Sequence, residues 1–209
     1  MRKPDPLAQA VTDARERLAH RAKRLGLATV GYDTRDSPLG PLWVAIGPRG
    51  VAAIHYGSEP DARDLRRIVA TYGPGVVPDR KRPARLAREL DQYFAGRRKT
   101  FDLDVDLSGL TDFQRRVLRA IARIGYGRLD TYAHIAKTNG NVRASRATGA
   151  ACGANPIPIV VPCHRVVASD GSLGGYAGGL PVKRLLLGLE RAGDVPEGGW
   201  SPARLGRRS

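Results

Sequence analysis

Cysteine is scarce in this chain of 209 residues, which contains only Cys152 and Cys163. Two cysteines are too few for the disulfide framework of a small secreted protein, and they favour a reducing compartment in which both thiols stay free. A structural zinc site needs about four cysteine or histidine ligands at close spacing. The four histidines stand singly along the chain, at His20, His55, His134 and His164. We therefore expect no metal and no other cofactor, and we expect the protein to be cytoplasmic.

Long apolar runs are also missing, since the longest extend over only a few residues. A membrane-spanning helix needs about 20 apolar residues, so the sequence predicts no association with a membrane. The N-terminus carries no apolar segment of the kind that directs secretion. Its basic residues are mixed with Asp5, Asp13 and Glu16, which argues against an organelle transit peptide.

Acidic residues are outnumbered, because 20 Asp and Glu stand against 35 Lys and Arg and give a formal net charge of +15. Of the basic residues, 29 are arginine and six are lysine. Such an excess favours a polyanionic partner, and the arginine fork suits phosphates and base edges. A charge that serves solubility, or the arginine bias of a GC-rich genome, explains the same excess. From composition alone, two alternatives are equally supported: the protein binds nucleic acid, or its charge serves no specific partner.

The first half of the chain has the mixed patterns of an α/β domain. Residues 5–25 place apolar side chains at helical spacing among arginines, and they predict a basic helix that docks on the body or contacts phosphates. Two apolar segments, 42–46 and 51–55, flank a Gly-Pro-Arg-Gly turn and predict a β-hairpin. The proline- and arginine-rich residues 74–82 predict a loop. Apolar residues alternate strictly with aspartate over 101–107, which predicts a half-buried strand.

The character of the sequence changes after Ser108, where helices and turns replace strands. Thr111 and Gln114 have the spacing of a capping box, in which each side chain satisfies a free N–H group at a helix start. The apolar periodicity that follows predicts a helix up to Ile124. We therefore expect a domain boundary at this point.

Two short helices around a polar turn are predicted next, which suggests a helix-turn-helix. The first begins at Thr131, and the second runs from about Val142 to Cys152. The second is built of small residues with one long side chain, Arg146. A helix that reads the major groove needs several long donors, so this smooth surface favours a shallow or narrow groove. Close packing against another helix explains the small residues equally well.

A proline-rich segment leads into a Cys-His pair. Pro156, Pro158 and Pro162 fix the backbone and predict an extended segment ahead of Cys163 and His164. A thiol with a reference pKa of about 8.5 is mostly protonated at neutral pH, and a neighbouring base raises its thiolate fraction. Adjacent side chains of an extended segment point apart, so we expect a bridging water rather than a direct bond between the two. By itself, a Cys-His pair is more often structural than catalytic.

The sequence Pro162-Cys163-His164-Arg165-Val166 resembles the active-site motif of the O6-alkylguanine-DNA alkyltransferases, or methylated-DNA–protein-cysteine methyltransferases. The resemblance covers about residues 30–192 and keeps order and spacing in the segments 111–123, 126–136, 143–149, 155–167, 174–179 and 183–190. It implies an N-terminal α/β domain with an RNase-H-like sheet, followed by a mostly helical domain with a helix-turn-helix. On this basis we divide the chain into a basic helical extension (1–29), an α/β domain (30–108), a DNA-binding and catalytic domain (109–192) and a flexible tail (193–209).

The resemblance assigns roles to single residues by position. Cys163 matches the alkyl-accepting nucleophile, His164 the base that takes the thiol proton through a water, and Glu190 the carboxylate that orients the histidine. Tyr132 matches the tyrosine that acts on the 3′ phosphate of the target and helps to protonate the departing guanine. Arg146 matches the arginine finger that enters the space of the flipped base.

The resemblance also implies a DNA-binding surface and a substrate pocket. The residues expected to bind DNA are Tyr132, Ala144, Ser145, Arg146, Ala147, Thr148 and Gly149. The residues expected to form the pocket are Asn155, Val166, Val167, Tyr176, Ala177 and Gly178. Asn155 matches a hinge asparagine that ties the recognition helix to the active-site segment. Ala177 stands where some members have serine, so one hydrogen bond to the base is expected to be missing.

The implied activity is DNA repair by direct reversal of damage. An alkyl group passes irreversibly, once per molecule, from guanine O6 in duplex DNA to Cys163, with O4-alkylthymine as a second candidate substrate. We expect a monomer that binds the minor groove and flips the target nucleotide out of the stack. Three rival functions are a lesion-recognition protein that does not react, a helix-turn-helix regulator and a cysteine hydrolase. The first lacks the cysteine, and the second does not need the Pro-Cys-His segment.

Overall fold

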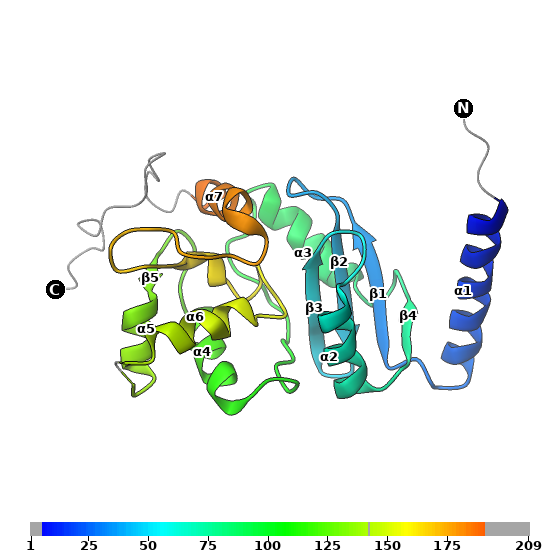
Figure 1. Ribbon diagram of the computed structural model, residues 1–209. Helices are drawn as coiled ribbons and strands as arrows, with labels where there is room; N and C mark the ends of the chain where they lie inside the picture. The colour runs from blue at the N-terminus through cyan, green and yellow to red at the C-terminus, as the bar shows by residue number, and fades with distance from the viewer. Residues whose placement is uncertain (1–5, 142, 191–209) are drawn as a thin grey trace.

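The computed structural model describes residues 6–141 and 143–190, which form a sheet-containing half and a helical half (Figure 1). The predictions made for Val142 and for residues 191–209 lie outside the described residues.

A four-stranded sheet in the order β3-β2-β1-β4 forms the centre of the first half. The strands are β1 (Val30–Arg35), β2 (Leu42–Gly47), β3 (Gly50–Tyr56) and β4 (Val76–Pro78). β2 pairs antiparallel with β1 and with β3, whereas β4 runs parallel to β1. The predicted hairpin is therefore confirmed. Its turn needs a glycine at position 50, because φ is 124° there and a Cβ would lie 2.3 Å from the Asp104 carbonyl oxygen.

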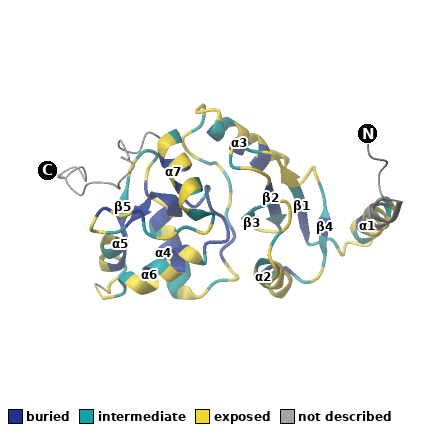
Figure 2. Cartoon of the chain, turned by 45° about the horizontal axis from the view of Figure 1, so that its top comes forward, coloured by how far each residue is buried: buried dark blue, intermediate teal, exposed yellow. Residues whose placement is uncertain are grey.

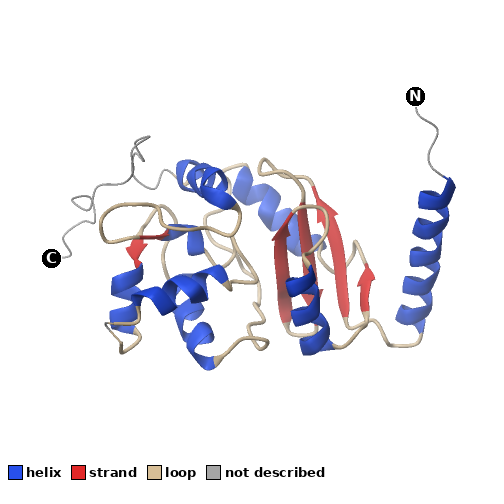
Figure 3. Cartoon of the chain, in the orientation of Figure 1, coloured by secondary structure: helices blue, strands red, loops and turns tan. Residues whose placement is uncertain are grey.

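Helices cover both faces of this sheet. α2 (Ala62–Tyr72) lies in front of it and α3 (Ala84–Phe94) lies behind it (Figure 3). Figure 2 shows exposed residues on α2 and buried residues in the strands behind it. A small apolar cluster that includes Trp43 and Ile68 fills the α2 side, whereas the other face joins a large core that continues into the helical half.

The basic helix predicted at the N-terminus is α1 (Pro6–Arg24), which stands beside β4 at the edge of the sheet (Figure 1). Lys23 near its end pairs with Asp79 at 3.1 Å. Leu18 is 69% exposed, so the helix leaves part of its apolar side in solvent. Among the described residues, no helix is both long enough and apolar enough to cross a membrane.

The helical half consists of α4 (Asp112–Ala122), α5 (Tyr132–Thr138), α6 (Ser145–Gly153) and α7 (Gly179–Leu189). Between them lie the 3-10 turn η1 (Cys163–Arg165) and a parallel pair of short strands, β5 (Asp130–Thr131) and β6 (Val166–Val167). α4 begins with the predicted capping box between Thr111 and Gln114.

α5 and α6 pack against each other, as the predicted helix-turn-helix requires. α5 begins after its predicted cap, Thr131, whose hydroxyl accepts a hydrogen bond from the His134 amide at 3.1 Å. α6 begins at Ser145, three residues later than expected. A turn precedes it, in which the Ala144 amide donates to the Asn141 carbonyl at 3.0 Å.

Two expectations about strands were wrong. Residues 101–107 do not form a strand, because they pair with the free edge of β3 only around Val105, where the Val51 amide donates to the Asp104 carbonyl at 2.8 Å. The next part of that edge is occupied by Pro156, whose carbonyl accepts from the Ile54 amide at 2.9 Å. Residues 74–82, expected to be a loop, contain β4, where a proline is tolerated because the strand lies at the sheet edge.

Candidate active site

Cys163 lies at the start of η1, with 4% of its surface exposed. The extended segment predicted ahead of Cys163 is not formed, because residues 156–161 turn back on themselves: the Val161 amide donates to the Ile157 carbonyl at 2.9 Å, and Ile159 has a φ of 74°. Prolines fix φ but not ψ, so they also fit successive turns. The Arg165 amide then donates to the Pro162 carbonyl at 2.9 Å and closes a 3-10 turn. The Asn155 side chain fixes the thiol, since its amide nitrogen donates to Cys163 Sγ at 3.1 Å and to the Val161 carbonyl at 2.8 Å. Its amide oxygen accepts from the Ile157 amide at 3.0 Å. One buried side chain thus holds the preceding turn and the sulfur in one arrangement.

His164 and Glu190 form a buried pair behind the cysteine. Nε2 of His164 lies 2.9 Å from Oε1 of Glu190, and both side chains are completely buried. With the carboxylate on Nε2, that nitrogen carries the proton and Nδ1 holds the free lone pair. Nδ1 is buried and has no hydrogen-bond partner among the described residues. Buried polar atoms normally have a hydrogen-bond partner, so we expect a water or a substrate to donate a hydrogen bond to this nitrogen.

Burial dominates the proton affinities of this group. It raises the pKa of Cys163, although the hydrogen bond from Asn155 works in the other direction. It lowers the pKa of His164, although Glu190 opposes the shift. Burial also raises the pKa of Glu190, but hydrogen bonds from His164 and Arg165 outweigh it and bring the value to about 2. At neutral pH the resting site therefore holds a thiol, a neutral imidazole and a carboxylate.

Glu190 has more partners than the sequence predicted. Arg165 donates to it twice, from Nε to Oε2 and from Nη2 to Oε1, each at 2.8 Å. The hydroxyl of Tyr93 in α3 donates to Oε1 at 2.7 Å, and the Gly127 amide donates to Oε2 at 3.2 Å. Arg165 stands inside the Pro-Cys-His-Arg motif, so a forked donor next to the pair was visible in the sequence. Nothing in the sequence near Tyr93 pointed to this site.

A cavity of about 530 Å³ opens in front of Cys163. Six residues predicted for the reaction, the pocket or the DNA contact line it together with the cysteine: Tyr132, Ser145, Arg146, Gly149, Tyr176 and Ala177. Cys152 and Gly153 of α6 and Gly175 of the loop between β6 and α7 complete the lining. The helix, the nucleophile and the loop of residues 174–178 therefore meet at one opening.

Two tyrosines are held at the rim of this cavity. The Tyr132 hydroxyl donates to the Gly175 carbonyl at 3.4 Å, and burial raises its pKa to about 12. The Tyr176 hydroxyl lies 2.6 Å from the hydroxyl of Tyr56 in β3, so the pocket loop is tied to the sheet-containing half. Gly174 has to be glycine, because φ is +65° and a Cβ would lie 2.9 Å from the Tyr132 ring.

Several predicted site residues lie away from the cavity. Thr148 is fully buried within α6, so it has no surface with which to bind DNA. Val166 and Val167 are fully buried in β6 and contribute to the core rather than to the lining. Gly178 packs on the ring of Tyr56, which a Cβ would approach to 2.9 Å. On α6, by contrast, Arg146 and Ala147 are exposed, and Ala144, Ser145 and Gly149 are half-buried.

Lys183 is a buried cation to which no sequence motif assigned a role. It has no exposed surface, and its Nζ donates to the Val166 carbonyl at 2.6 Å and to the Leu173 carbonyl. Burial lowers its pKa to about 8, although the two cysteines oppose the shift. Its charge in turn lowers the pKa of Cys163.

One group of possible metal ligands occurs among the described residues, at His55, Asp61 and Asp64, whose ligand atoms lie within 4.8 Å of one another. His55 Nδ1 lies 3.0 Å from Asp64 Oδ2, and Asp61 caps α2 by accepting from the Asp64 amide at 2.8 Å. These contacts account for the cluster without an ion. At Cys163, the arrangement of thiol, imidazole and carboxylate supports a covalent transfer to sulfur.

Two family models match the chain. The one described as "6-O-methylguanine DNA methyltransferase, ribonuclease-like domain" matches residues 30–107, and the one described as "6-O-methylguanine DNA methyltransferase, DNA binding domain" matches residues 112–192. Together with the observed sheet and helices, they confirm the predicted order of a ribonuclease-like domain followed by a helical DNA-binding domain.

Named relatives and solved structures agree with these models. The methylated-DNA–protein-cysteine methyltransferase of Mycolicibacterium paratuberculosis is 43% identical over 165 residues, which are 78% of this chain and 93% of the relative. The protein of the same name from Methanosarcina barkeri is 40% identical over 159 residues, 76% of this chain and 96% of the relative. The crystal structure of Mycobacterium tuberculosis OGT in complex with DNA matches with a TM-score of 0.68 at 38% identity, and the match covers 78% of this chain and 93% of that chain.

Proposed function

The chain belongs to the 6-O-methylguanine DNA methyltransferase family and functions in DNA repair by alkyl transfer, and we propose that Cys163 is the residue that accepts the alkyl group. The observation that carries this assignment is the position of its sulfur, which faces a cavity of about 530 Å³ with the buried His164–Glu190 pair behind it. Cys152 lines the same cavity, but no imidazole pair supports it, and burial raises its pKa to about 12.

The first step is removal of the thiol proton. A water between Sγ and the unpaired Nδ1 of His164 carries that proton to the imidazole, and Glu190 stabilises the cation that forms. The burial that raises the pKa of Cys163 makes this base necessary, because a thiolate does not accumulate at neutral pH without it.

Transfer then forms a carbon–sulfur bond and breaks the bond between the alkyl carbon and guanine O6. The electron pair of the broken bond stays on the guanine, which is a poor leaving group as an anion. Tyr132 lines the cavity and remains protonated at neutral pH, because its pKa is about 12. We assign it to protonate the guanine, and the proton taken up by His164 restores the tyrosine through water. The thioether is stable in water, so each molecule reacts once.

Recognition of the alkylated base falls to the residues around the opening. Tyr176 forms one wall, held by Tyr56, and Asn155 keeps the sulfur directed at the opening. Ala177 offers no hydroxyl, so the base is held with one hydrogen bond fewer than a serine there would provide. We propose O6-alkylguanine as the substrate, with O4-alkylthymine as the second candidate.

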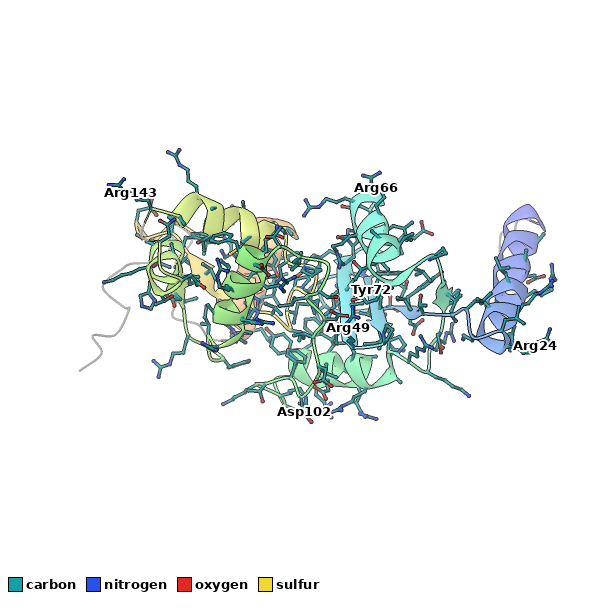
Figure 4. All side chains as sticks on the ribbon, turned by 90° about the horizontal axis from the view of Figure 1, so that it is seen from below. Arg24, Arg49, Arg66, Tyr72, Asp102 and Arg143 are labelled. Carbon is teal, nitrogen blue, oxygen red and sulfur yellow. The ribbon has the colours of Figure 1, made fainter. Side chains whose placement is uncertain are left out.

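Duplex DNA is the partner, and we propose that it binds through its minor groove over α6. The exposed and half-exposed residues of that helix are small, apart from Arg146, which also lines the cavity. Such a surface approaches a narrow groove closely, while Arg146 enters the space that the flipped nucleotide leaves. The same side of the molecule carries Arg143 and, on α2, Arg66 (Figure 4). Thr148 is no part of this surface.

We propose that the protein acts as a monomer. A reactive thiol that stays free supports the cytoplasm as its location. We retain the division into an extension (1–29), two domains (30–108 and 109–192) and a tail (193–209) as part of this proposal.

The proposed function is tested by the fate of the damaged base. A duplex with one O6-methylguanine is incubated with increasing amounts of protein, digested to nucleosides and quantified. We expect unmodified guanine to appear in proportion to the protein added, one molecule for each protein molecule, with no turnover. Catalytic turnover indicates a hydrolase, and binding of the duplex with no restored guanine indicates a lesion-recognition protein; either result contradicts the proposal.

A further inference from the structure

A tyrosine of the ribonuclease-like domain reaches into the relay of the other domain. Tyr93 in α3 is fully buried, and its hydroxyl donates to Oε1 of Glu190 at 2.7 Å. The same oxygen accepts from His164 Nε2 at 2.9 Å and from Arg165 Nη2 at 2.8 Å. The hydroxyl therefore shares one carboxylate oxygen with the base of the reaction.

The ring of Tyr93 is fixed by other aromatic rings. The ring centroids of Phe94 and Phe101 each lie 5.4 Å from that of Tyr93, and the centroid of Tyr126 lies 6.2 Å away. A ring held in this way on three sides has little freedom to redirect its hydroxyl. The position of the hydroxyl on Glu190 is thus set by the packing of α3 and not by the carboxylate alone.

We propose that Tyr93 is a positioning residue of the alkyl transfer, through which the ribonuclease-like domain holds Glu190 in place and tunes the base strength of His164. This inference rests on the proposed function of His164. It gives the first domain a part in the chemistry, besides its part in the common core.

The direction of the tuning follows from the hydrogen bonds on Glu190. A carboxylate that accepts from Tyr93 shares less of its charge with the imidazolium, so the hydroxyl lowers the proton affinity of His164. The other charged groups that act on His164 are Arg165 from η1 and Lys183 from α7, and both also disfavour the imidazolium. Removing the Tyr93 hydroxyl leaves these two cations in place. It strengthens only the Glu190 carboxylate as an acceptor for the His164 imidazolium.

The test compares Tyr93→Phe with a matched control, Tyr126→Phe. The control loses a hydroxyl that donates to a backbone carbonyl, that of Leu189, at 3.0 Å. The titration of His164 is followed by its ¹⁵N imidazole shifts in the full, unreacted chain, and thermal unfolding checks that each variant is folded. We expect the midpoint for His164 to rise by about half a unit to one unit in Tyr93→Phe and to stay unchanged in Tyr126→Phe.

Kinetics provide the second readout. The single-turnover rate with free O6-benzylguanine is measured against pH, and we expect the acid limb in Tyr93→Phe to move to higher pH, with a loss of about threefold to tenfold near its midpoint. In a Glu190→Gln background the same substitution should have little further effect, because its action passes through the carboxylate. An unchanged His164 midpoint, or equal losses in both backgrounds, overturns the role of Tyr93. Wild-type protein that fails to react contradicts the proposed function instead, and the ¹⁵N titration remains informative in that case.

Discussion

Asn155 binds three groups at once, namely Cys163 Sγ, the Val161 carbonyl and the Ile157 amide. We predict that Asn155→Ala lowers the free energy of unfolding by about 2 to 4 kcal/mol, because three hydrogen bonds of about 1 kcal/mol each and the packing of a buried amide are lost. The rate at which free O6-benzylguanine alkylates Cys163 should fall at least about tenfold, since a displaced sulfur loses its alignment. Urea unfolding and single-turnover kinetics measure the two effects.

Asn139 provides the control for this variant. Its side chain donates one hydrogen bond, to the Ile135 carbonyl at 2.8 Å, at the end of α5. Asn139→Ala should cost about 1 kcal/mol or less and leave the rate unchanged. Equal effects of the two substitutions would show that Asn155 is an ordinary turn residue.

The pH dependence of the reaction follows from His164. Its pKa is lowered by burial from the usual 6.5, although Glu190 raises it and Arg165 and Lys183 lower it further. Because the neutral form is the base and a lowered pKa preserves it to lower pH, the rate should stay flat from pH 8 to about 6.5 and fall only below that value. Single-turnover rates with free O6-benzylguanine between pH 5 and 8 test this, and a midpoint above 6.5 contradicts it.

Single residues differ in how far the sequence predicts them. Cys163, His164 and Glu190 follow from the motif and its spacing, and the structure brings the last two into contact. Thr148 shows the limit of such transfer, because a place in a helix near DNA does not reveal which face is buried. Tyr93 lies 97 positions before Glu190, and only the packing of the two domains makes them neighbours.

At the scale of elements, α6 is suited to a close approach by a duplex, and Arg146 is its one long side chain. We predict that Arg146→Ala lowers the rate on duplex O6-methylguanine by about 30- to 100-fold, because flipping a base costs a few kcal/mol and the finger occupies the vacated space. The rate with free O6-benzylguanine should change less than about twofold, since no base is flipped. Arg143→Ala, an exposed arginine on the same side, should change neither rate by more than a few fold. Equal losses on duplex and free base would place Arg146 in the chemistry rather than in flipping.

Helices and strands could be predicted from the sequence where residues close together in the chain determine them. The hairpin of β2 and β3, the cap of α4 and the helix α1 depend on turn residues, capping residues and apolar periodicity within a few positions. The strand expected at 101–107 failed because period two also fits an extended segment beside a sheet. Whether such a segment joins the sheet depends on the free edge, which Pro156 partly occupies. β4 was missed because its pairing with β1 is not local.

On the scale of the whole molecule, α2 continues the side that carries Arg143, as Figure 4 shows for Arg66. Arg63 and Arg66 of α2 are exposed, and neither forms an ion pair with the described residues. We predict that the double variant Arg63→Ala, Arg66→Ala binds a long duplex more weakly and lowers the slope of log affinity against log salt by about two, because each phosphate contact contributes about 0.9.

The matched variant is Arg88→Ala, Arg97→Ala, which removes the same charge from exposed positions on and just after α3, behind the sheet. It should change the slope by much less. Equal changes of the slope in both double variants would mean that the affinity for DNA depends on net charge alone.

Cys163 should keep the alkyl group after a single transfer. The intact mass of the protein is measured after incubation with duplex DNA that carries O6-methylguanine, followed by peptide mapping. We predict that wild type and Cys152→Ala each gain the mass of one methylene group, located on the peptide of Cys163, and that Cys163→Ala gains nothing. An unchanged mass in the wild type, or a gain that persists in Cys163→Ala, would show that Cys163 is not the acceptor.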